Sequence, residues 1–298
     1  KSDFDLLVLD IEMPEMDGFE VLERMSADPE LRQVPVIVTS ALEGVANVVR
    51  CIELGAEDYL TKPINAVLLK ARIGASLEKK RLRDQQRELV QRFATSEVAL
   101  DLQRSGFTLG GKRVEASVMF ADIRGFTTLA ERQPAEETIE LLNTFYTLMF
   151  EAINAQGGVV NQMIGDGLMA IFGAPAPLKA HAECAALAAL DMLEMIDLLN
   201  TDREGEGKAP IAIGVGIATG QVVAGYTGTM QRATYTCVGD TVNLAARLES
   251  HTKEAKRRIL VDAATRAELG SAFEVEALGA VSLKGKLAQV DVFSIQAY

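Results

Sequence analysis

A charged segment at about residues 65–96 divides the sequence into two parts that cannot share one hydrophobic core. Its stretch LLKARIGASLEKKRLRDQQRELVQRF (68–93) has no proline, one glycine and only sparse apolar residues. This pattern predicts one long connecting helix whose apolar stripe is too thin to be buried in a core. Such a stripe suits a helix that pairs weakly with a copy of itself as a coiled coil, or a single solvated helix.

The residues before this helix have the pattern of a parallel sheet. Continuous apolar runs alternate with helical patterns; the runs are FDLLVLD (4–10), VPVIVTS (34–40) and AEDYLTKP (56–63). Strands that are buried on both faces and alternate with helices indicate a parallel α/β sheet. Sites in such sheets lie at the carboxyl ends of the strands, where Asp10, Ser40 and Lys62 occur.

The residues after the helix follow a different pattern, in which helices alternate with hairpins. We predict strands at 113–122, 159–164, 168–173, 211–220, 257–262 and 290–295, and helices at 137–158, 180–200 and 241–250. A polar loop is expected at 201–210 and a turn-rich segment at 225–240. The combination predicts an antiparallel α+β domain.

Composition bounds the class of protein. The 298 residues suffice for two domains, and 48% hydrophobic with 24% charged residues is typical of soluble globular proteins. Thirty basic against 42 acidic residues give a net charge of −12, which argues against a nucleic-acid partner. Three scattered cysteines favour a reduced, cytoplasmic protein. No signal peptide and no apolar run of about 18 residues is present, so we expect no membrane segment.

Two aspartates in the second part are candidate metal ligands. Asp122 ends an apolar strand before the turn IRGFT, and Asp166 lies 44 residues later in the hairpin IGDGLMAIFG. Two carboxylates at strand ends beside exposed backbone amides suit two divalent cations and a polyphosphate. Each aspartate taken alone is more typical of a turn. The nearby GVGIATG is best interpreted as a strand crowded by a neighbour.

The stretch YTCVGDTVNLAARLE (235–249) holds a second candidate site. Asn243 and Arg247 are four residues apart and therefore share one helical face. An arginine there could clamp a phosphate and an asparagine could orient a sugar, although this segment taken alone is more typical of a solvated helix face.

Together these motifs resemble the catalytic domain of class III nucleotidyl cyclases, from about Leu109 to Ser294. The motifs are LGGKRVEASVMFADIRGFT, IGDGLMAIFG, GDTVNLAARLE and LKGK, in this order. The resemblance implies a ferredoxin-like core that forms a head-to-tail homodimer with two interfacial active sites. It also implies that ATP, or alternatively GTP, is converted to the cyclic nucleotide and pyrophosphate.

The resemblance assigns roles to individual residues. It implies that Asp122, Asp166 and the backbone carbonyl of Ile123 hold two Mg²⁺ or Mn²⁺ ions. The partner subunit would supply Asn243 for the ribose, Arg247 for the transition state and Lys284 for the triphosphate. Further substrate contacts are expected from Phe126 and Thr127.

Two positions are expected to recognise the purine. Gln162 occupies a position that is usually Lys in adenylate cyclases and Glu in guanylate cyclases, and its amide can both donate and accept. Thr236 occupies the second position, where a hydroxyl would accept from the adenine amino group. Cys237 is one residue away and faces the other side of its strand. We therefore expect ATP as the main substrate.

The first part resembles a response-regulator receiver domain. The 30 residues from Asp10 to Ser40, the 52 from Asp10 to Lys62 and the motif EMPEMDGFE carry this resemblance. It implies that Asp10 is phosphorylated by a histidine kinase or phosphotransfer protein. Ser40 and Tyr59 would form the switch pair, and Lys62 would contact the phosphoryl group before a cis-proline. The resemblance begins at the third strand of that family, so we expect phosphorylation of this chain by itself to be impaired.

The predicted organisation has three parts. Residues 1–70 form the carboxyl-terminal part of a flavodoxin-like receiver, 71–108 a helical linker and 109–298 the cyclase domain. Two rival functions are a catalytically inactive dimer that senses nucleotide and a phosphorelay module with a polyphosphate-hydrolysing domain. Turnover of ATP and GTP side by side would separate these alternatives.

Overall fold

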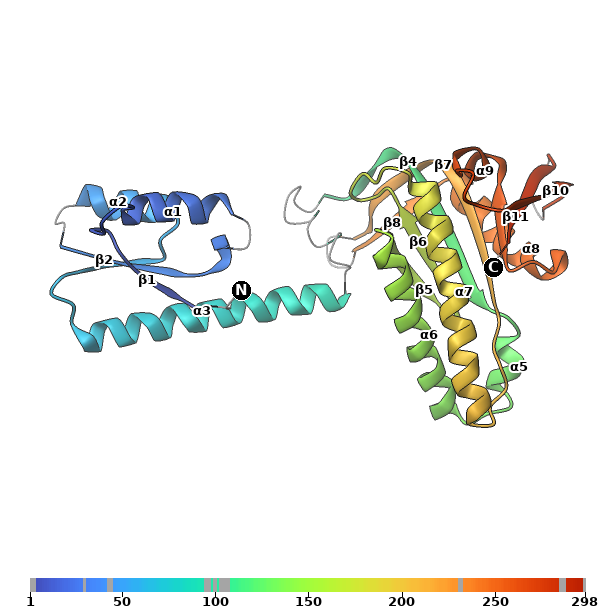
Figure 1. Cartoon of the computed structure of the whole chain (residues 1–298), viewed down its shortest axis with the longest axis horizontal. Coiled ribbons are helices and arrows are strands. Elements are labelled where there is room, and N and C mark those ends of the chain that lie inside the picture. The colour runs from blue at the N-terminus through green and yellow to red at the C-terminus, as the bar shows by residue number, and fades with distance from the viewer. Residues whose placement is uncertain are drawn as a thin grey trace. The chain divides into compact units, whose positions relative to one another are not determined.

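The computed structural model describes residues 4–28, 31–41, 45–93, 98, 101, 108–229, 233–283 and 288–296. The chain divides into two compact units, Lys1–Phe93 and Ala94–Tyr298 (Figure 1). Within the described ranges, no helix is long and apolar enough to cross a membrane. The predicted fold class, an α/β unit followed by an α+β unit, is confirmed.

The amino-terminal unit is a three-stranded parallel sheet with the strand order β1-β2-β3. Its elements are β1 (Leu7–Asp10), α1 (Gly18–Ala27), η1 (Leu31–Gln33), β2 (Val36–Ser40), α2 (Val45–Glu53), β3 (Asp58–Thr61) and α3 (Ala66–Phe93). Helices α1 and α2 lie on one side of the sheet and α3 on the other (Figure 1). A small core that includes Leu9, Leu22 and Val38 joins α1 to the sheet.

The predicted long helix is present as α3. Its amino-terminal half is held to the sheet by ion pairs of Arg72 with Asp58 at 3.1 Å and of Lys79 with Glu57, also at 3.1 Å. Leu77 and Leu82 stay largely exposed, as the thin apolar stripe predicts. The last residues of the predicted segment, 94–96, lie outside the described residues.

The carboxyl-terminal unit is built on one mainly antiparallel sheet with the order β10-β11-β9-β7-β4-β6-β5, and β8 pairs with β7. Its strands are β4 (Gly110–Ile123), β5 (Val159–Ile164), β6 (Gly167–Phe172), β7 (Ile213–Gly228), β8 (Ala233–Val238), β9 (Ile259–Asp262), β10 (Val275–Val281) and β11 (Val290–Ile295). Its helices are α5 (Phe126–Ala130), α6 (Ala135–Ala155), α7 (His181–Gly205), α8 (Asp240–Ala255) and α9 (Ala263–Glu268).

Both faces of this sheet are covered because its central strands are apolar on both sides. Met119 of β4 packs into the core beneath α6 and α7, whereas its neighbour Val118 packs into a second core with Leu248 of α8. Gly216 of β7 lets α8 approach closely, since a Cβ atom there would lie 2.1 Å from the backbone nitrogen of Glu249. The interpretation of GVGIATG as a crowded strand is therefore confirmed.

The sequence-based assignment of secondary structure was wrong in three respects. Helix α7 continues to Gly205 through the first half of the predicted loop, because Arg203 is buried and donates to the carbonyl of Ala209 at 2.9 Å. Within the predicted turn-rich segment 225–240, residues 225–228 belong to β7 and residues 233–238 form β8, and these two strands pair. The prediction omitted the short elements α5, α9 and β10.

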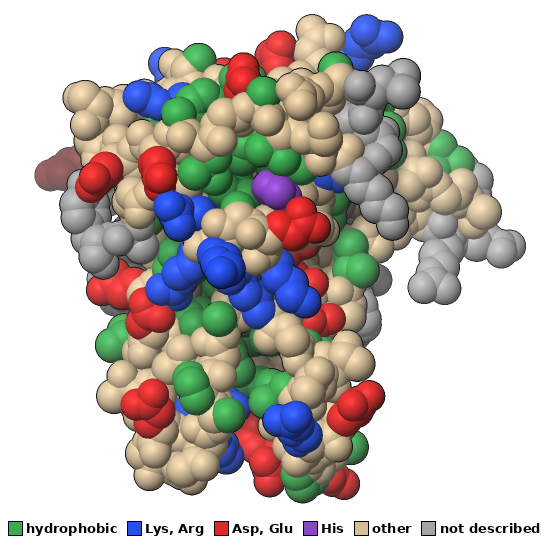
Figure 2. All heavy atoms as spheres, turned by 90° about the vertical axis from the view of Figure 1, so that its right-hand side faces the viewer, with side chains coloured by type: hydrophobic (Ala, Val, Ile, Leu, Met, Phe, Trp, Pro, Cys, Tyr) green, Lys and Arg blue, Asp and Glu red, His purple; other side chains and the backbone are tan. Residues whose placement is uncertain are grey.

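Charge is mixed on the face of the molecule seen in Figure 2. Lys and Arg side chains gather near its centre, with acidic side chains beside them. Two arginines of this unit illustrate the pairing: Arg257 bonds Glu276 and Arg258 bonds Asp197, both at 2.9 Å. The charges of these two arginines are therefore compensated locally.

Candidate active site

The two candidate metal ligands meet where β4 pairs with β6. Asp122 lies opposite Gly167 in this antiparallel ladder, and Asp166 is in the turn that connects β5 to β6. Gly165 has φ of 64°, a left-handed conformation that suits glycine. A Cβ atom on Gly167 would lie 2.9 Å from the carbonyl oxygen of Ala121 and 3.3 Å from Oδ1 of Asp122. Both glycines are therefore needed to bring Asp166 beside Asp122.

Tyr146 of α6 holds this turn in place. Its hydroxyl donates to the carbonyl oxygen of Gly165 at 2.5 Å and lies 3.5 Å from that of Gly167. Burial, followed by the charges of Asp166 and Asp122, raises the pKa of the Tyr146 phenol, so it stays a donor at neutral pH. Sequence reasoning missed this residue, since no local pattern links position 146 to a turn 19 residues away.

The two carboxyl groups of the acidic pair, Asp122 and Asp166, destabilise each other as anions. Burial, the hydrogen bond and charge of Asp166, and the charge of Glu249 raise the pKa of Asp122 to about 7. Among the residues that the structure describes, no Lys, Arg or His forms an ion pair with either carboxylate. The described residues therefore supply no cation to the pair.

The acidic pair suits divalent cations. Oδ1 of Asp122 is buried without a hydrogen-bond partner among the described groups, and a buried oxygen in that state is costly. Hard cations such as Mg²⁺ take carboxylate and carbonyl oxygens as ligands. No group of three or more acidic, histidine or cysteine side chains forms a ligand cluster among the described residues, which offer this pair instead.

Helix α8 brings a third acid close to the pair. Glu249 has a raised pKa, mainly because of burial, and it interacts with the charges of Arg124 and Asp166. Oε1 of Glu249 would lie 3.2 Å from a Cβ atom on Gly214, so that glycine leaves room for it. Arg124 donates to the carbonyl of Thr252 at 3.3 Å. Neither Arg124 nor Glu249 was predicted.

The segment after Asp122 turns sharply into α5. Gly125 has φ of 69°, as the predicted tight turn requires, and precedes this short helix. Phe126 packs against the core while Thr127 is exposed. The backbone nitrogen of Ile123 donates to the carbonyl of Asp166 at 3.4 Å, which joins the two ends of the acidic site.

The residues expected to act across a dimer interface lie on α8. Asn243 is exposed and Arg247 is half-buried, while the residue that follows each of them, Leu244 and Leu248, is buried. Within the described part of the chain, no hydrogen bond or ion pair holds the side chain of either residue. Lys284 lies outside the described residues.

The strands that carry the two positions predicted to recognise the purine meet within one chain. Thr236 of β8 donates to Oδ1 of Asn161 on β5 at 3.3 Å, next to the exposed Gln162. Cys237 is buried and faces away, as expected from strand alternation.

In the amino-terminal unit, the predicted residues gather at the carboxyl ends of the strands. Lys62 bonds the carboxylate of Asp10, and this hydrogen bond is the main cause that lowers the pKa of Asp10. Ser40 is buried at the end of β2 and Tyr59 is half-buried on β3. The Lys62–Pro63 peptide bond is cis, as predicted.

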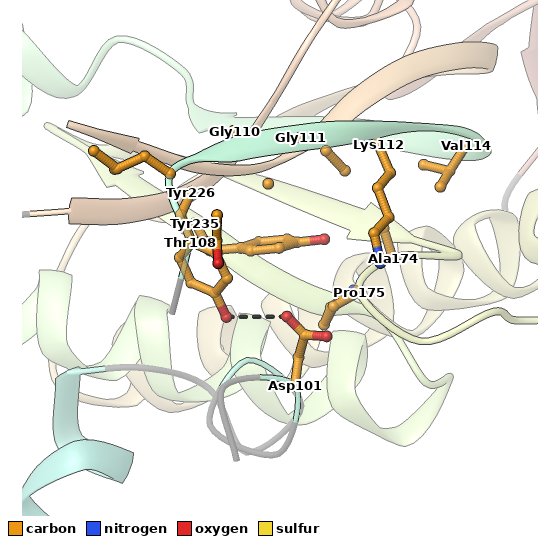
Figure 3. A pocket seen from close by; sticks show the side chains of 13 residues that line it. Asp101, Thr108, Gly110, Gly111, Lys112, Val114, Ala174, Pro175, Tyr226 and Tyr235 are labelled. Carbon is orange, nitrogen blue, oxygen red and sulfur yellow. Dashed lines mark hydrogen bonds between the residues drawn. The ribbon is translucent and has the colours of Figure 1, made fainter. Parts of the chain in front are cut away.

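A cavity of about 490 Å³ lies apart from the acidic pair, at the start of β4 (Figure 3). Tyr226 and Tyr235 form its floor with their rings 5.1 Å apart, and the Tyr226 hydroxyl donates to Asp101 at 3.1 Å. Asp101, which precedes β4 within the carboxyl-terminal unit, is thereby joined to the β7–β8 hairpin.

Family models match both units. The model of the adenylate and guanylate cyclase catalytic domain matches residues 112–297, and that of the response regulator receiver domain matches residues 1–74. The first match covers more than half of the chain. The chain therefore belongs to the adenylate and guanylate cyclase family, with a receiver domain in front of the catalytic domain.

Three similar proteins illustrate the range of this family. Adenylate cyclase 1 of Rhizobium meliloti is 32% identical over 204 residues, which cover 66% of this chain and 31% of that protein. The adenylyl cyclase CyaB of P. aeruginosa is 31% identical with a TM-score of 0.60, covering 64% and 97% of the two chains. The guanylyl cyclase Cya2 is 30% identical with a TM-score of 0.59, covering 63% and 95%. The chain spans about a third of the length of the first curated relatives that it matches.

Proposed function

We propose that this protein is an adenylate cyclase that acts as a homodimer and is regulated through its receiver domain. The acidic pair Asp122 and Asp166 carries the proposal. It is partly buried, has no described protein cation and leaves a carboxylate oxygen without a partner, which is what a site for divalent cations needs.

The reaction forms a bond between the ribose 3′ oxygen and the α-phosphorus while the bond to pyrophosphate breaks. Two divalent cations, Mg²⁺ or Mn²⁺, would supply the Lewis acidity that favours loss of the 3′-hydroxyl proton and binds the triphosphate. They would be held by Asp122, Asp166 and the carbonyl of Ile123. Tyr146 orients the turn that carries Asp166 and leaves both carboxylates free for this task.

The remaining residues position the substrate and stabilise charge. Asn243 orients the ribose, Arg247 stabilises the charge that develops on the α-phosphate, and Lys284, Phe126 and Thr127 contact the triphosphate end. The lack of described partners for Asn243 and Arg247 supports their use by a second copy of the chain. Positioning and charge stabilisation supply most of the barrier reduction in reactions of this kind.

A mixing experiment tests the composite site. Asp122→Ala and Arg247→Ala are each expected to be inactive as homodimers. Mixed heterodimers should regain one intact site and a substantial fraction of the parent activity. Heterodimers that form but stay inactive would place both residues in one subunit and overturn the proposal.

ATP is proposed as the substrate on the basis of Thr236 and Gln162. Neutral hydrogen bonds are roughly half as strong as charge-assisted ones, so Gln162 should discriminate less than Lys would. Gln162→Lys should therefore sharpen the preference for ATP over GTP. Faster turnover of GTP than of ATP by the parent protein, with the same metal, would make it a guanylate cyclase.

Regulation through α3 is the third element of the proposal. If α3 pairs with a second copy, one inserted residue near Gln85 rotates the pairing face, whereas seven residues preserve the heptad phase. The single insertion should then change activity several-fold more than the longer one. Equal activities would make α3 a passive connection.

A further inference from the structure

Asn161 occupies an irregular position in β5. Strand β5 pairs with β6 through Val160 opposite Ala170 and Gln162 opposite Met169, which leaves Asn161 as an extra residue between them. A bulge of this kind redirects a side chain away from the alternation of its strand. The half-buried side chain of Asn161 accordingly reaches β8, where its amide contacts two successive residues.

The orientation of this amide is fixed by its partners. Nδ2 of Asn161 donates to the backbone carbonyl of Tyr235, and a carbonyl oxygen can only accept. The amide therefore cannot be flipped, and Oδ1 must face Thr236. At 3.3 Å from Oδ1, the Thr236 hydroxyl donates its proton to Asn161.

A hydroxyl has one proton, so the Thr236 oxygen can then only accept from a further partner. The 6-amino group of adenine donates hydrogen bonds, whereas the 6-oxo group of guanine accepts them. We infer that Asn161 is a positioning residue that makes Thr236 selective for a 6-amino purine. This inference rests on the proposed adenylate cyclase function and on Thr236 facing the purine.

The test compares ATP with purine riboside triphosphate, which lacks the 6-amino group. We expect the parent protein to favour ATP in kcat/KM by about five- to tenfold, the value of one neutral hydrogen bond. Thr236→Val should abolish this preference and Asn161→Ala should reduce it at least about threefold. The double variant Asn161→Ala/Thr236→Val should show the same ratio of kcat/KM for the two substrates as Thr236→Val alone.

Two further variants separate this effect from a structural one. Asn161→Asp keeps an acceptor for Thr236 but loses the donor to the Tyr235 carbonyl, so it should retain only part of the preference. Asn154→Ala, at an exposed position on α6, should leave it unchanged. If Asn161→Ala lowers kcat/KM equally for both substrates, or still lowers the preference when Thr236 is Val, the inference is wrong.

A second ratio, measured in the same experiment, tests the proposed adenylate cyclase function. The ratio of ATP to GTP turnover by the parent protein reports substrate identity alone. A parent protein that prefers GTP overturns the adenylate cyclase proposal. The ratio of ATP to purine riboside triphosphate still decides whether Asn161 acts through Thr236.

Discussion

The two units each present an acid at the end of a strand, and the surroundings of these acids are opposite. Asp10 has Lys62 as a cation within its own domain, and its pKa is lowered. Asp122 has a second acid beside it and no described cation, and its pKa is raised to about 7. The charge of the first acid is balanced by a cation of its own domain, whereas the described residues supply no such cation to the second acid.

The largest expected effect comes from removing one acid of the pair. Asp122→Ala should lower cyclase activity by at least about 1000-fold, since metal-assisted charge stabilisation is lost. Steady-state assays with Mn²⁺ measure this, and sedimentation should show an unchanged dimer. Asp202→Ala, an exposed acid on α7, serves as the control. Appreciable turnover by Asp122→Ala would contradict the assignment of Asp122 as a metal ligand, and with it the contrast drawn between Asp122 and Asp10.

Removal of Arg247 should have the next largest effect, because a second copy of the chain is expected to supply this cation to the site. Arg247→Ala should lower kcat by about 100- to 1000-fold, equivalent to roughly 3–4 kcal/mol of barrier. Because Arg247 has no described ion pair to lose, the melting temperature should hardly change. A variant that loses stability and activity together would instead assign Arg247 a structural role.

The acidic pair should make the metal-free protein sensitive to pH. A raised pKa in the folded state means that the associated stability is present below pH 3.8 and is lost as pH rises through about 7. In EDTA, the catalytic unit should therefore melt at a lower temperature at pH 8 than at pH 6. Asp122→Asn should raise its free energy of unfolding at pH 8 by about 1–3 kcal/mol, a value reduced for partial solvation.

Added Mg²⁺ or Mn²⁺ supplies the control for that prediction. Divalent cations should stabilise the parent protein against heat and have little effect on Asp122→Asn. Thermal melting that is independent of pH between 6 and 8 in the parent protein would contradict the repulsion within the acidic pair.

The smallest effect is expected in the receiver. Lys62→Met should raise the pKa of Asp10, since the main cause of its lowering is removed. Both side chains are about a third exposed, so the stability lost should stay below about 1 kcal/mol at neutral pH. That contribution exists above pH 3.8 and disappears as pH falls, because the pKa in the folded state is lowered. Carboxyl-carbon NMR of Asp10 measures the pKa, with Lys70→Met as the control.

Residues whose spacing follows one element could be predicted from the sequence. The strand ends at Asp10, Ser40 and Lys62, and the turn at Asp166, follow from apolar runs that stop at polar residues. Tyr146 could not be predicted, because its partner is a backbone carbonyl that only the packing of α6 brings near. Asn161 was missed for a similar reason, since strand alternation assigns it to the wrong face until the bulge is known.

The element boundaries that failed also depended on tertiary contacts. Polar residues at 201–205 are typical of a loop, but α7 continues there because Arg203 is buried against the segment that leads into β7. The glycines at 225 and 228 are typical of turns, yet they lie in the β7–β8 ladder. At Gly225 the carbonyl oxygen of Gly110 would come within 2.1 Å of a Cβ atom, so close packing rather than turning explains this glycine.

The bond from Asp101 to Tyr226 has a mechanical consequence. Tyr226 pairs with Tyr235 across the β7–β8 ladder, and Tyr235 is the residue before Thr236. A pull on the chain at residue 101 would therefore act first on Tyr226, which lies opposite Gly110 of β4, and on the neighbouring β8. Asp122 lies at the opposite end of β4, and Tyr146 holds the turn of Asp166. If Thr236 contacts the base as proposed, force applied at residue 101 would act on base binding before it reaches the acidic pair. We therefore expect such an input to change KM more than kcat.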